Sequence, residues 1–413
     1  MNIHPHKRRW LILAVIFCAV VLNYVDRQIL SILKPTLKGE FGFDDTGYAL
    51  LVNMFTVAYA LMYPISGWLV DRFGARIVML CGIVSWSAAC VGAGITKSFG
   101  AFGLFRGLLG LSEPTAFPSQ IRVMAIWFPG SLRATANSIC LAGGTIGAII
   151  APPLVAWIAL TFEWRHAFIW PGIAGFAVAA VWFFLYREPP REILEETSTS
   201  AAADDETRFT WRQLWGTRSL WAILLIRFIS DPVWYFCLFW LPGYLQEESG
   251  LTLAQVGMVG WIPFLVADLS AVGSAAWSDR LVRRGVNPLK ARKIMLTCMA
   301  MLAPVCALTP YLGTPASTLG IFSLVAACCL SWLLSLCVVI AEAFPSRNVA
   351  SVLGIAGGFG AGGAIIFNTY VGEMLATIGS HRVFAVMACL HPIAALILWK
   401  WVRPERPPAR AVS

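Results

Sequence analysis

The most regular feature of this sequence is the alternation of long apolar stretches with short polar ones. A helix needs about 20 residues to cross the roughly 30 Å of hydrocarbon in a bilayer, and the chain offers twelve apolar stretches of about that length. We expect them at 10–34, 47–70, 77–96, 98–121, 133–160, 165–186, 218–246, 252–278, 293–312, 317–342, 350–377 and 381–401. The pattern predicts an all-α membrane protein with twelve transmembrane helices.

The composition supports this interpretation. Hydrophobic residues make up 58% of the 413 residues and charged residues 13%, which is more apolar surface than a soluble core buries. The formal net charge of +9 does not indicate nucleic-acid binding, because basic residues gather in short loops on one side, with clusters at 7–9, 280–293 and 400–410. Such loops stay in the cytoplasm. We therefore expect a multi-pass protein of a bacterial inner membrane, with both termini cytoplasmic.

The cysteines and histidines do not suggest a metal site. The eleven cysteines lie mostly within apolar stretches, and the five histidines are scattered. Neither set shows the paired spacing of metal ligands or of secreted disulfide frameworks, and buried thiols behave as small hydrophobes. Because no nucleophile, base or metal ligands are grouped, we expect no enzyme, no metal and no organic cofactor.

Two halves are suggested by a polar segment and by internal repeats. Residues 187–217 are rich in acidic, Ser, Thr and Ala residues and predict a cytoplasmic linker between the six-helix halves 1–186 and 218–413. The stretch 67–76 has a degraded echo at 277–285, and 133–144 recurs as 347–358. A parallel repeat of this kind predicts a transporter whose halves rock about a site between them.

Four ionisable residues, Asp26, Arg27, Arg106 and Glu113, lie inside otherwise apolar spans of the first half. A charge at membrane depth costs at least about 2.5–3.5 kcal/mol on insertion scales, so such residues usually pair with one another or line a water-filled cavity. Two cations beside two acids indicate a site for an organic anion with a proton as partner.

One loop carries a strong resemblance to a known family. Gly67-Trp-Leu-Val-Asp71-Arg72-Phe-Gly74-Ala-Arg76, after the second span, resembles the signature loop of the major facilitator superfamily. The resemblance implies a conformational role, in which Gly67, Asp71, Arg72, Gly74 and Arg76 form a gate. Gly67 is expected to permit close helix contact, and Asp71 to face the positive end of a neighbouring helix.

Within that superfamily the chain resembles the anion:cation symporters, and most closely the hexuronate transporters. The motifs that carry this are Leu22-Asn-Tyr-Val-Asp-Arg27, Arg106-Gly-Leu-Leu-Gly-Leu-Ser-Glu113, and Asp231-Pro-Val-Trp-Tyr235 with Phe239-Trp-Leu-Pro242. The resemblance implies proton-coupled import of a small organic anion such as galacturonate or glucuronate.

Helix geometry supports the site. At about 1.5 Å per residue, Arg27 and Arg106 both lie roughly 10–12 Å below the outer surface, so they can bind one carboxylate together. Glu113 follows Arg106 by seven residues and therefore lies on nearly the same helix face, about 10 Å deeper. In a low dielectric it is expected to bind the transported proton. Asp26 points about 100° away from Arg27 and either shares the proton coupling or neutralises an arginine.

Further candidate ligands carry weaker signals. Tyr24 precedes Arg27 by three residues, Tyr59 falls where the resembled family has a substrate-binding tyrosine, and Asn368 is a polar group at depth in the second half. We expect all three to contact the substrate. Arg227 and Asp231 have i, i+4 spacing and predict an ion pair within one helix.

Several alternatives remain open at this point. The four charges can instead be structural ion pairs between helices. The fifth span offers Ala142-Gly-Gly-Thr145 where relatives that take sugar acids present an amide, so an aldonate, an aromatic acid or a dicarboxylate is an alternative substrate. A sensor that binds the anion without transporting it is a further alternative. We expect a monomer with the bilayer, the anion and the proton as its partners.

Overall fold

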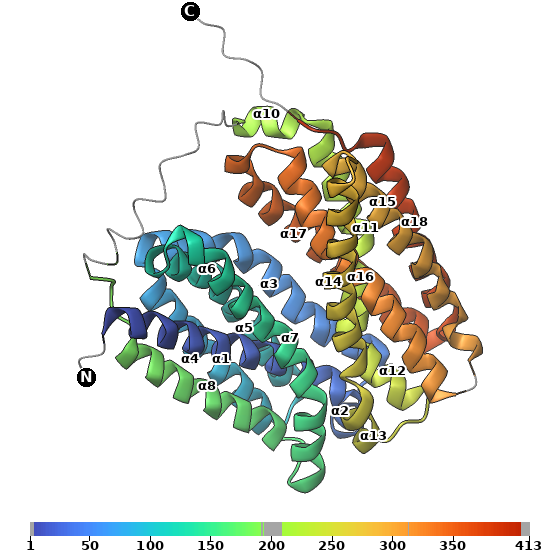
Figure 1. Cartoon of the computed structure of the whole chain (residues 1–413). Coiled ribbons are helices and arrows are strands. Elements are labelled where there is room, and N and C mark those ends of the chain that lie inside the picture. The colour runs from blue at the N-terminus through green and yellow to red at the C-terminus, as the bar shows by residue number, and fades with distance from the viewer. Residues whose placement is uncertain (1–3, 191–192, 194–208, 313, 406–413) are drawn as a thin grey trace, which may run out of the picture. The chain divides into compact units, whose positions relative to one another are not determined.

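A computed structural model describes residues 4–190, 193, 209–312 and 314–405 (Figure 1). Within these residues the regular structure is helical, and eleven helices are long and apolar enough to cross a membrane. The prediction of an all-α membrane fold is confirmed. The chain divides into two compact units, Met1–Asp204 with Leu251–Trp261 and Asp205–Gly250 with Ile262–Ser413. The half and linker boundaries taken from the sequence stay a prediction.

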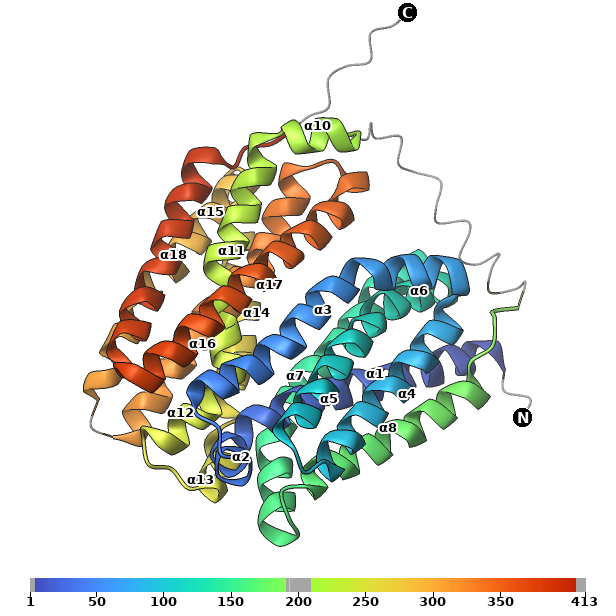
Figure 2. The same cartoon turned by 180° about the vertical axis from the view of Figure 1, so that it is seen from behind.

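Unit 1, the first of these, contains the helices that carry the candidate charges. Its elements are α1 (Pro5–Ile32), α2 (Lys34–Phe41), α3 (Asp45–Phe73), α4 (Ala75–Ile95), α5 (Phe99–Ser112), the 3₁₀ turn η1 (Glu113–Thr115), α6 (Ala116–Trp127), α7 (Gly130–Thr161), α8 (His166–Leu185) and α13 (Leu253–Val259). Helix α3 lies beside α5 in both views of the fold (Figure 1 and Figure 2).

Unit 2 is built in the same all-helical manner. Its elements are α10 (Trp211–Gly216), α11 (Arg218–Phe239), α12 (Leu241–Glu247), α14 (Ile262–Arg283), α15 (Pro288–Leu302), η2 (Ala303–Tyr311), α16 (Pro315–Ala343), α17 (Ser346–Thr377) and α18 (His381–Trp401). Most of the expected linker, including its acidic stretch, lies outside the described residues, but its end forms α10. The backbone of Phe209 is held by the buried Asn348 amide, through bonds of 2.9 and 3.2 Å.

Small residues let the helices of unit 1 approach closely. A Cβ added to Gly143, Gly144 or Gly147 of α7 would lie 3.0, 2.8 and 2.6 Å from atoms of α1. Helices pack backbone to backbone in membranes through residues of this size. The same contact fixes the height of α1, and therefore of Tyr24 and Arg27, against its neighbours.

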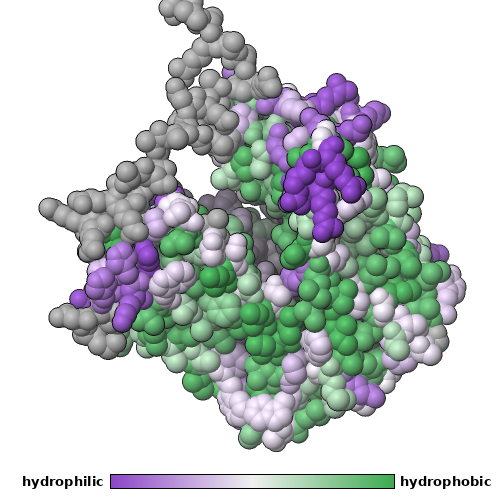
Figure 3. Space-filling view, in the orientation of Figure 1, coloured by the Kyte–Doolittle hydropathy of each residue, from purple (hydrophilic) through white to green (hydrophobic). Residues whose placement is uncertain are grey.

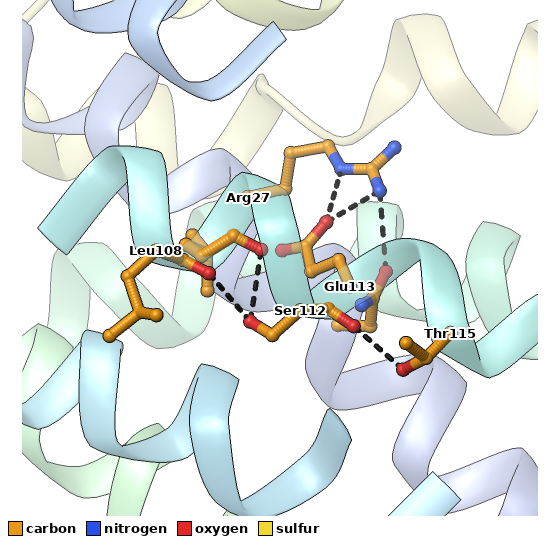
Figure 4. Close-up of polar contacts among 7 residues, drawn as sticks. Arg27, Leu108, Ser112, Glu113 and Thr115 are labelled. Carbon is orange, nitrogen blue, oxygen red and sulfur yellow. Dashed lines mark hydrogen bonds and ion pairs between the residues drawn. The ribbon is translucent and has the colours of Figure 1, made fainter. Parts of the chain in front are cut away.

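The fourth predicted span is not one continuous helix. Helix α5 ends at Ser112, η1 covers Glu113–Thr115, and α6 then continues to Trp127. Pro114 has no backbone N–H to donate, which interrupts the helical ladder. Hydroxyl groups bond the carbonyls around the break, since Ser112 Oγ donates to Leu108 O at 2.8 Å and Thr115 Oγ1 donates to Ser112 O at 2.7 Å (Figure 4). Because of this break, neither α5 nor α6 alone is long enough to cross a membrane. The structure therefore has eleven long apolar helices where the sequence predicts twelve spans.

Three other predicted spans are also divided. The span expected at 218–246 is α11 followed by α12, the one at 252–278 is α13 followed by α14, and the one at 293–312 is α15 followed by η2. Pro242 stands at the second position of α12, and η2 contains Pro304 and Pro310, which disfavour a continuous α-helix. The span pattern does not predict these breaks, because hydropathy alone does not register them.

The surface of each unit suits a lipid environment. Figure 3 shows hydrophobic residues over much of the visible face, with hydrophilic residues gathered in separate patches. Leu61 and Leu104 of unit 1 and Leu269 and Val272 of unit 2 are among many large apolar side chains that are exposed. Apolar surface of this extent is uncommon on soluble monomers and is what hydrocarbon chains cover.

The close packing of α5 on α3 gives a stability prediction. In Gly110→Ala the new Cβ would collide with the carbonyl oxygen of Phe55, whereas at Gly107 the nearest atom is Met54 O at 3.9 Å. Overpacking typically costs about 1–3 kcal/mol. We expect Gly110→Ala to lower the thermal unfolding midpoint in detergent. Gly107→Ala, the matched control on the same helix, should leave it unchanged or raise it, because alanine is the better helix former. Equal midpoints for the two variants would contradict the packing.

Candidate functional site

The centre of the site is an ion pair between α1 and η1. Arg27 donates from Nε and from Nη2 to Oε2 of Glu113, at 3.1 and 2.6 Å (Figure 4). The Arg27 side chain is 13% exposed and that of Glu113 is fully buried. Arg27 Nη2 also donates to Asn23 Oδ1 at 3.4 Å. Among the described residues Glu113 Oε1 has no hydrogen-bond partner, so the carboxylate is only partly satisfied.

Aromatic rings surround the guanidinium of Arg27. Its Cζ lies 5.1 Å from the ring centre of Tyr24, 5.3 Å from that of Phe55 and 5.0 Å from that of Tyr59. Cations within about 6 Å of such a ring are attracted to its face. Tyr24 and Tyr59 are half-buried, so the two predicted tyrosines and Arg27 form the accessible part of the site.

Phe55, which the sequence did not single out, contacts both arginines. The Cζ of Arg106 lies 5.1 Å from its ring centre. With Tyr59 and Tyr63, Phe55 forms a row of rings on α3, at centroid distances of 5.7 and 5.8 Å. The i, i+4 spacing of these aromatic residues was a usable signal, because it places them on one helix face.

Arg106 is the less well compensated of the two arginines. It is 1% exposed, and within the described residues its Nε and Nη2 have no hydrogen-bond partner. It lies close enough to Glu113 for the two charges to interact. A buried cation with unmet donors is costly, so Arg106 offers hydrogen-bond donors to an anion that takes the place of Glu113.

Asp26 contacts a different helix from Arg27. Its Oδ1 accepts a hydrogen bond from Cys90 Sγ of α4 at 3.4 Å, and its Oδ2 has no partner among the described residues. The predicted divergence of neighbouring side chains on α1 is confirmed. Asp26 also interacts electrostatically with Glu113 and Arg106, so the four predicted charges form one cluster. Cys90 was not predicted, because a thiol within an apolar span resembles a packing residue.

The cluster is electrically balanced when both acids are ionised. Two cations then face two anions in a largely buried setting. Removing one partner of a buried pair is strongly unfavourable, so an incoming carboxylate must replace Glu113 rather than simply join it. Chemically, the site can exchange one carboxylate for another if a proton neutralises the first.

The small residues of α7 have a specific neighbour. A Cβ on Gly144 would lie 2.8 Å from the ring of Tyr24. The space in which a longer side chain at this position would lie is therefore occupied by Tyr24. Glycine thus stands in the span where an amide was expected, and the predicted substrate ligand Tyr24 lies against it.

The residues predicted to form a gate lie at the end of α3 and the start of α4. Gly74 has a φ of +82° and ends α3, a conformation that glycine adopts without strain. Asp71 Oδ1 lies 3.3 Å from Arg122 Nη1, and Arg76 Nη2 donates to Phe183 O at 3.3 Å. The Arg72 guanidinium lies over the rings of Trp68 and Phe73.

The expectation for Gly67 is not met within unit 1. No atom lies within 4 Å of a Cβ built on this glycine, so it does not support a close helix contact there. Its open position reflects the outward direction of this face of α3, whose neighbours Trp68 and Ile65 are exposed.

Asn368, the candidate substrate ligand in unit 2, is hydrogen-bonded to another side chain. Asn368 is fully buried, and its Oδ1 accepts from Trp240 Nε1 at 3.1 Å, while its Nδ2 has no partner among the described residues. Arg227 Nη2 lies 3.0 Å from Asp231 Oδ2, which confirms the ion pair predicted from their spacing.

Comparison with protein families decides the classification. The family model described as Major Facilitator Superfamily matches residues 16–289, and the one described as Sugar (and other) transporter matches residues 186–403. The chain belongs to the Major Facilitator Superfamily. It is accordingly a multi-pass membrane transporter.

Similar proteins span most of the chain. The hexuronate transporter of Escherichia coli (strain K12) is 28% identical over 408 residues, covering 95% of this chain and 93% of that protein. The galacturonate transporter of Dickeya chrysanthemi is 26% identical and covers 71% of this chain and 88% of that protein. The probable galactarate/D-glucarate transporter GudP of Bacillus subtilis (strain 168) is 30% identical, covering 71% and 70%.

Solved structures agree on the fold. The crystal structure of a D-xylose-proton symporter matches with a TM-score of 0.78 at 16% identity, covering 95% of this chain and 98% of that one. A bacterial homologue of the human lysosomal transporter Spinster, in an inward-facing and occupied conformation, matches with a TM-score of 0.76 at 18% identity, covering 96% and 97%. At these identities the likeness establishes the fold alone.

The buried ion pair gives a prediction about stability. Glu113→Ala leaves the buried Arg27 without its carboxylate, which should lower the free energy of unfolding by about 3–5 kcal/mol. Adding Arg27→Met removes the unpaired cation and should restore part of that loss. Unfolding in mixed micelles, arranged as a double-mutant cycle, measures the coupling.

The exposed Asp71 and Arg122 pair, whose side chains are 83% and 40% exposed, provides the control cycle. Asp71→Asn and Arg122→Gln should couple by about 0–1 kcal/mol. If the effects at Arg27 and Glu113 were simply additive, the ion pair would have no energetic role.

Proposed function

We propose that this chain is a proton-coupled symporter that imports a hexuronate, such as galacturonate or glucuronate. It would act as a monomer in a bacterial inner membrane, with both termini in the cytoplasm. The names of the similar transporters, which include hexuronate and galacturonate, support the substrate class. The basic stretches 7–9, 280–293 and 400–410 support the orientation.

The buried ion pair between Arg27 and Glu113 is the observation that carries the proposal. In this pair the Glu113 carboxylate is bound to the Arg27 guanidinium, which is the group that a substrate carboxylate would bind. Protonation of Glu113 removes its charge and frees Arg27 for the substrate. The proton and the anion therefore enter the site together, because either one alone leaves an uncompensated charge.

Arg106 supplies the second cation for the substrate. Its unpartnered Nε and Nη2 are donors with the fork geometry that suits a carboxylate. Tyr24 and Tyr59 flank Arg27 and would present hydroxyl groups and ring faces to the sugar. Asn368 is proposed as a further ligand from unit 2, through the Nδ2 that Trp240 leaves unused.

Asp26 is proposed as a second proton site, since it interacts electrostatically with both Glu113 and Arg106. The loop residues Gly67, Asp71, Arg72, Gly74 and Arg76 are proposed as the conformational gate. Their contacts with α6 and α8, through Arg122 and Phe183, are exposed enough to break and re-form at small cost.

Coupling follows from linkage between the two ligands. If the proton raises the affinity for the anion by some factor, the anion raises the affinity for the proton by the same factor. Both ligands then shift the same equilibrium between conformations. Affinity for the anion should accordingly fall as the pH is raised.

The first prediction of the proposal concerns substrate binding. Arg106→Ala and Arg27→Ala should each weaken galacturonate binding by at least about tenfold, because a desolvated carboxylate loses a charged partner. Arg106→Lys should restore little, since an ammonium lacks the bidentate fork. Calorimetry on the purified protein measures both effects.

Arg227→Ala removes a cation that is already paired with Asp231 on α11, and it serves as the control. It should bind galacturonate within a few fold of the wild type. Galactonate and galactarate belong in the same titration, because similar proteins are named for galactonate and galactarate. If Arg27→Ala and Arg106→Ala both bound galacturonate as tightly as the wild type, these arginines would not belong to the site.

The second prediction separates proton coupling from binding. Glu113→Gln mimics the protonated carboxyl, so it should still bind galacturonate, with weaker pH dependence, and exchange labelled for unlabelled substrate in proteoliposomes. Uptake against a concentration gradient, driven by an imposed proton gradient, should be lost. Gradient-driven accumulation by a well-folded Glu113→Gln protein would move the coupling to Asp26 or elsewhere. Binding of galacturonate without any exchange or uptake by the wild type would favour a sensor.

A further inference from the structure

A groove on unit 2 combines an apolar lining with a cation. It has a volume of about 460 Å³, within the roughly 300–1,000 Å³ of ligand pockets. Helices α11, α17 and α18 contribute its walls. Its principal lining residues are Arg218, Trp221, Leu225, Phe228, Phe359 and Trp401.

Two cations lie beside Trp401, one of the residues that line this groove. Arg218 is the first residue of α11, and its Cζ is 5.6 Å from the ring centre of Trp401. Lys400 Nζ lies 5.4 Å from the centre of the same ring. Neither cation forms an ion pair within the described residues. The nearby acid Glu405 is engaged elsewhere, because its Oε1 accepts from Ser219 N at 3.3 Å and from Ser219 Oγ at 2.7 Å.

Tryptophans mark this end of the unit as the boundary of the membrane. Trp221 Nε1 donates to Trp215 O at 2.9 Å, and the two rings lie 5.4 Å apart. The short helix α10 presents Trp211 to the surface while its Leu214 is buried. Tryptophan gathers at the headgroup level of bilayers, as do basic residues near helix ends. The groove therefore begins among headgroups and is lined by apolar side chains such as Leu225 and Phe228.

We propose that this groove binds one anionic phospholipid of the surrounding bilayer. An acyl chain lies against Trp221, Leu225 and Phe228, and the phosphate is bound by Arg218 and Lys400. Basic pockets between transmembrane helices select anionic headgroups in this way. A zwitterionic lipid gains less, because the groove offers its ammonium group no carboxylate.

Other grooves of the molecule provide a contrast. The grooves of about 270 and 550 Å³ on α3, α4 and α5 are also apolar, but no charged side chain lines either of them. They suit hydrocarbon chains of any lipid. The pairing of an apolar wall with unpaired cations sets the groove on α11 apart.

Native mass spectrometry of the full chain tests the proposal. The probes are phosphatidylglycerol and phosphatidylcholine with the same acyl chains. Wild-type protein should retain phosphatidylglycerol preferentially. Arg218→Gln combined with Lys400→Gln should reduce that retention by about tenfold or more, because these are the two cations that would bind the phosphate beside the groove.

Arg283→Gln combined with Arg284→Gln is the matched control. It also removes two exposed cations of unit 2, but at the end of α14 and away from the groove. It should retain phosphatidylglycerol like the wild type. Leu225→Trp keeps both groove cations and narrows the apolar wall, so it should lower retention as well. Helix content by circular dichroism establishes that each variant is folded.

Three results would overturn the proposal. They are equal retention of the two lipids by the wild type, equal loss in the control pair, and full retention by a folded Arg218→Gln, Lys400→Gln protein. Retention unaffected by Leu225→Trp would contradict the position of the acyl chain.

Discussion

The buried ion pair between Arg27 and Glu113 is the constraint around which unit 1 is arranged. Arg27 Nη2 and Glu113 Oε2 are 2.6 Å apart, and both side chains are almost out of contact with solvent. Neither charge is therefore stable without the other or a substitute. The rings of Tyr24, Phe55 and Tyr59 enclose the guanidinium, which limits the water that could replace the carboxylate. A proton on Glu113 and an anion on Arg27 together restore the balance, and this physical requirement is the basis of the proposed coupling.

The helix break at Pro114 positions the acid of this pair. Glu113 lies in the 3₁₀ turn between α5 and α6, and the hydroxyls of Ser112 and Thr115 bond the carbonyls of Leu108 and Ser112, which precede it. Close approach of α5 to α3 at Gly110, and of α7 to α1 at Gly147, holds the helix that leads into Glu113 and the helix that carries Arg27. The small residues of these helices are thus part of the site although they contact no charge.

Much of this arrangement is readable from the sequence, and the remainder has physical reasons for being hidden. Span lengths gave the all-helical membrane fold, and local i, i+4 spacing gave the pair of Arg227 with Asp231. The charges at membrane depth were identified because each is costly there. Which acid pairs with which arginine depends on tertiary packing, which no spacing encodes. Phe55 and Cys90 were not predicted, because an aromatic ring or a thiol within an apolar span resembles an ordinary packing residue.

The central claim is that the anion and the proton occupy the site together. Its most direct test is the number of protons that the purified protein takes up when galacturonate binds, followed with a pH indicator in weakly buffered solution from neutral to alkaline pH. The account predicts net proton uptake by the wild type and a clearly smaller uptake by Glu113→Gln. Saturable binding of galacturonate by the wild type with no proton uptake at any pH would contradict it.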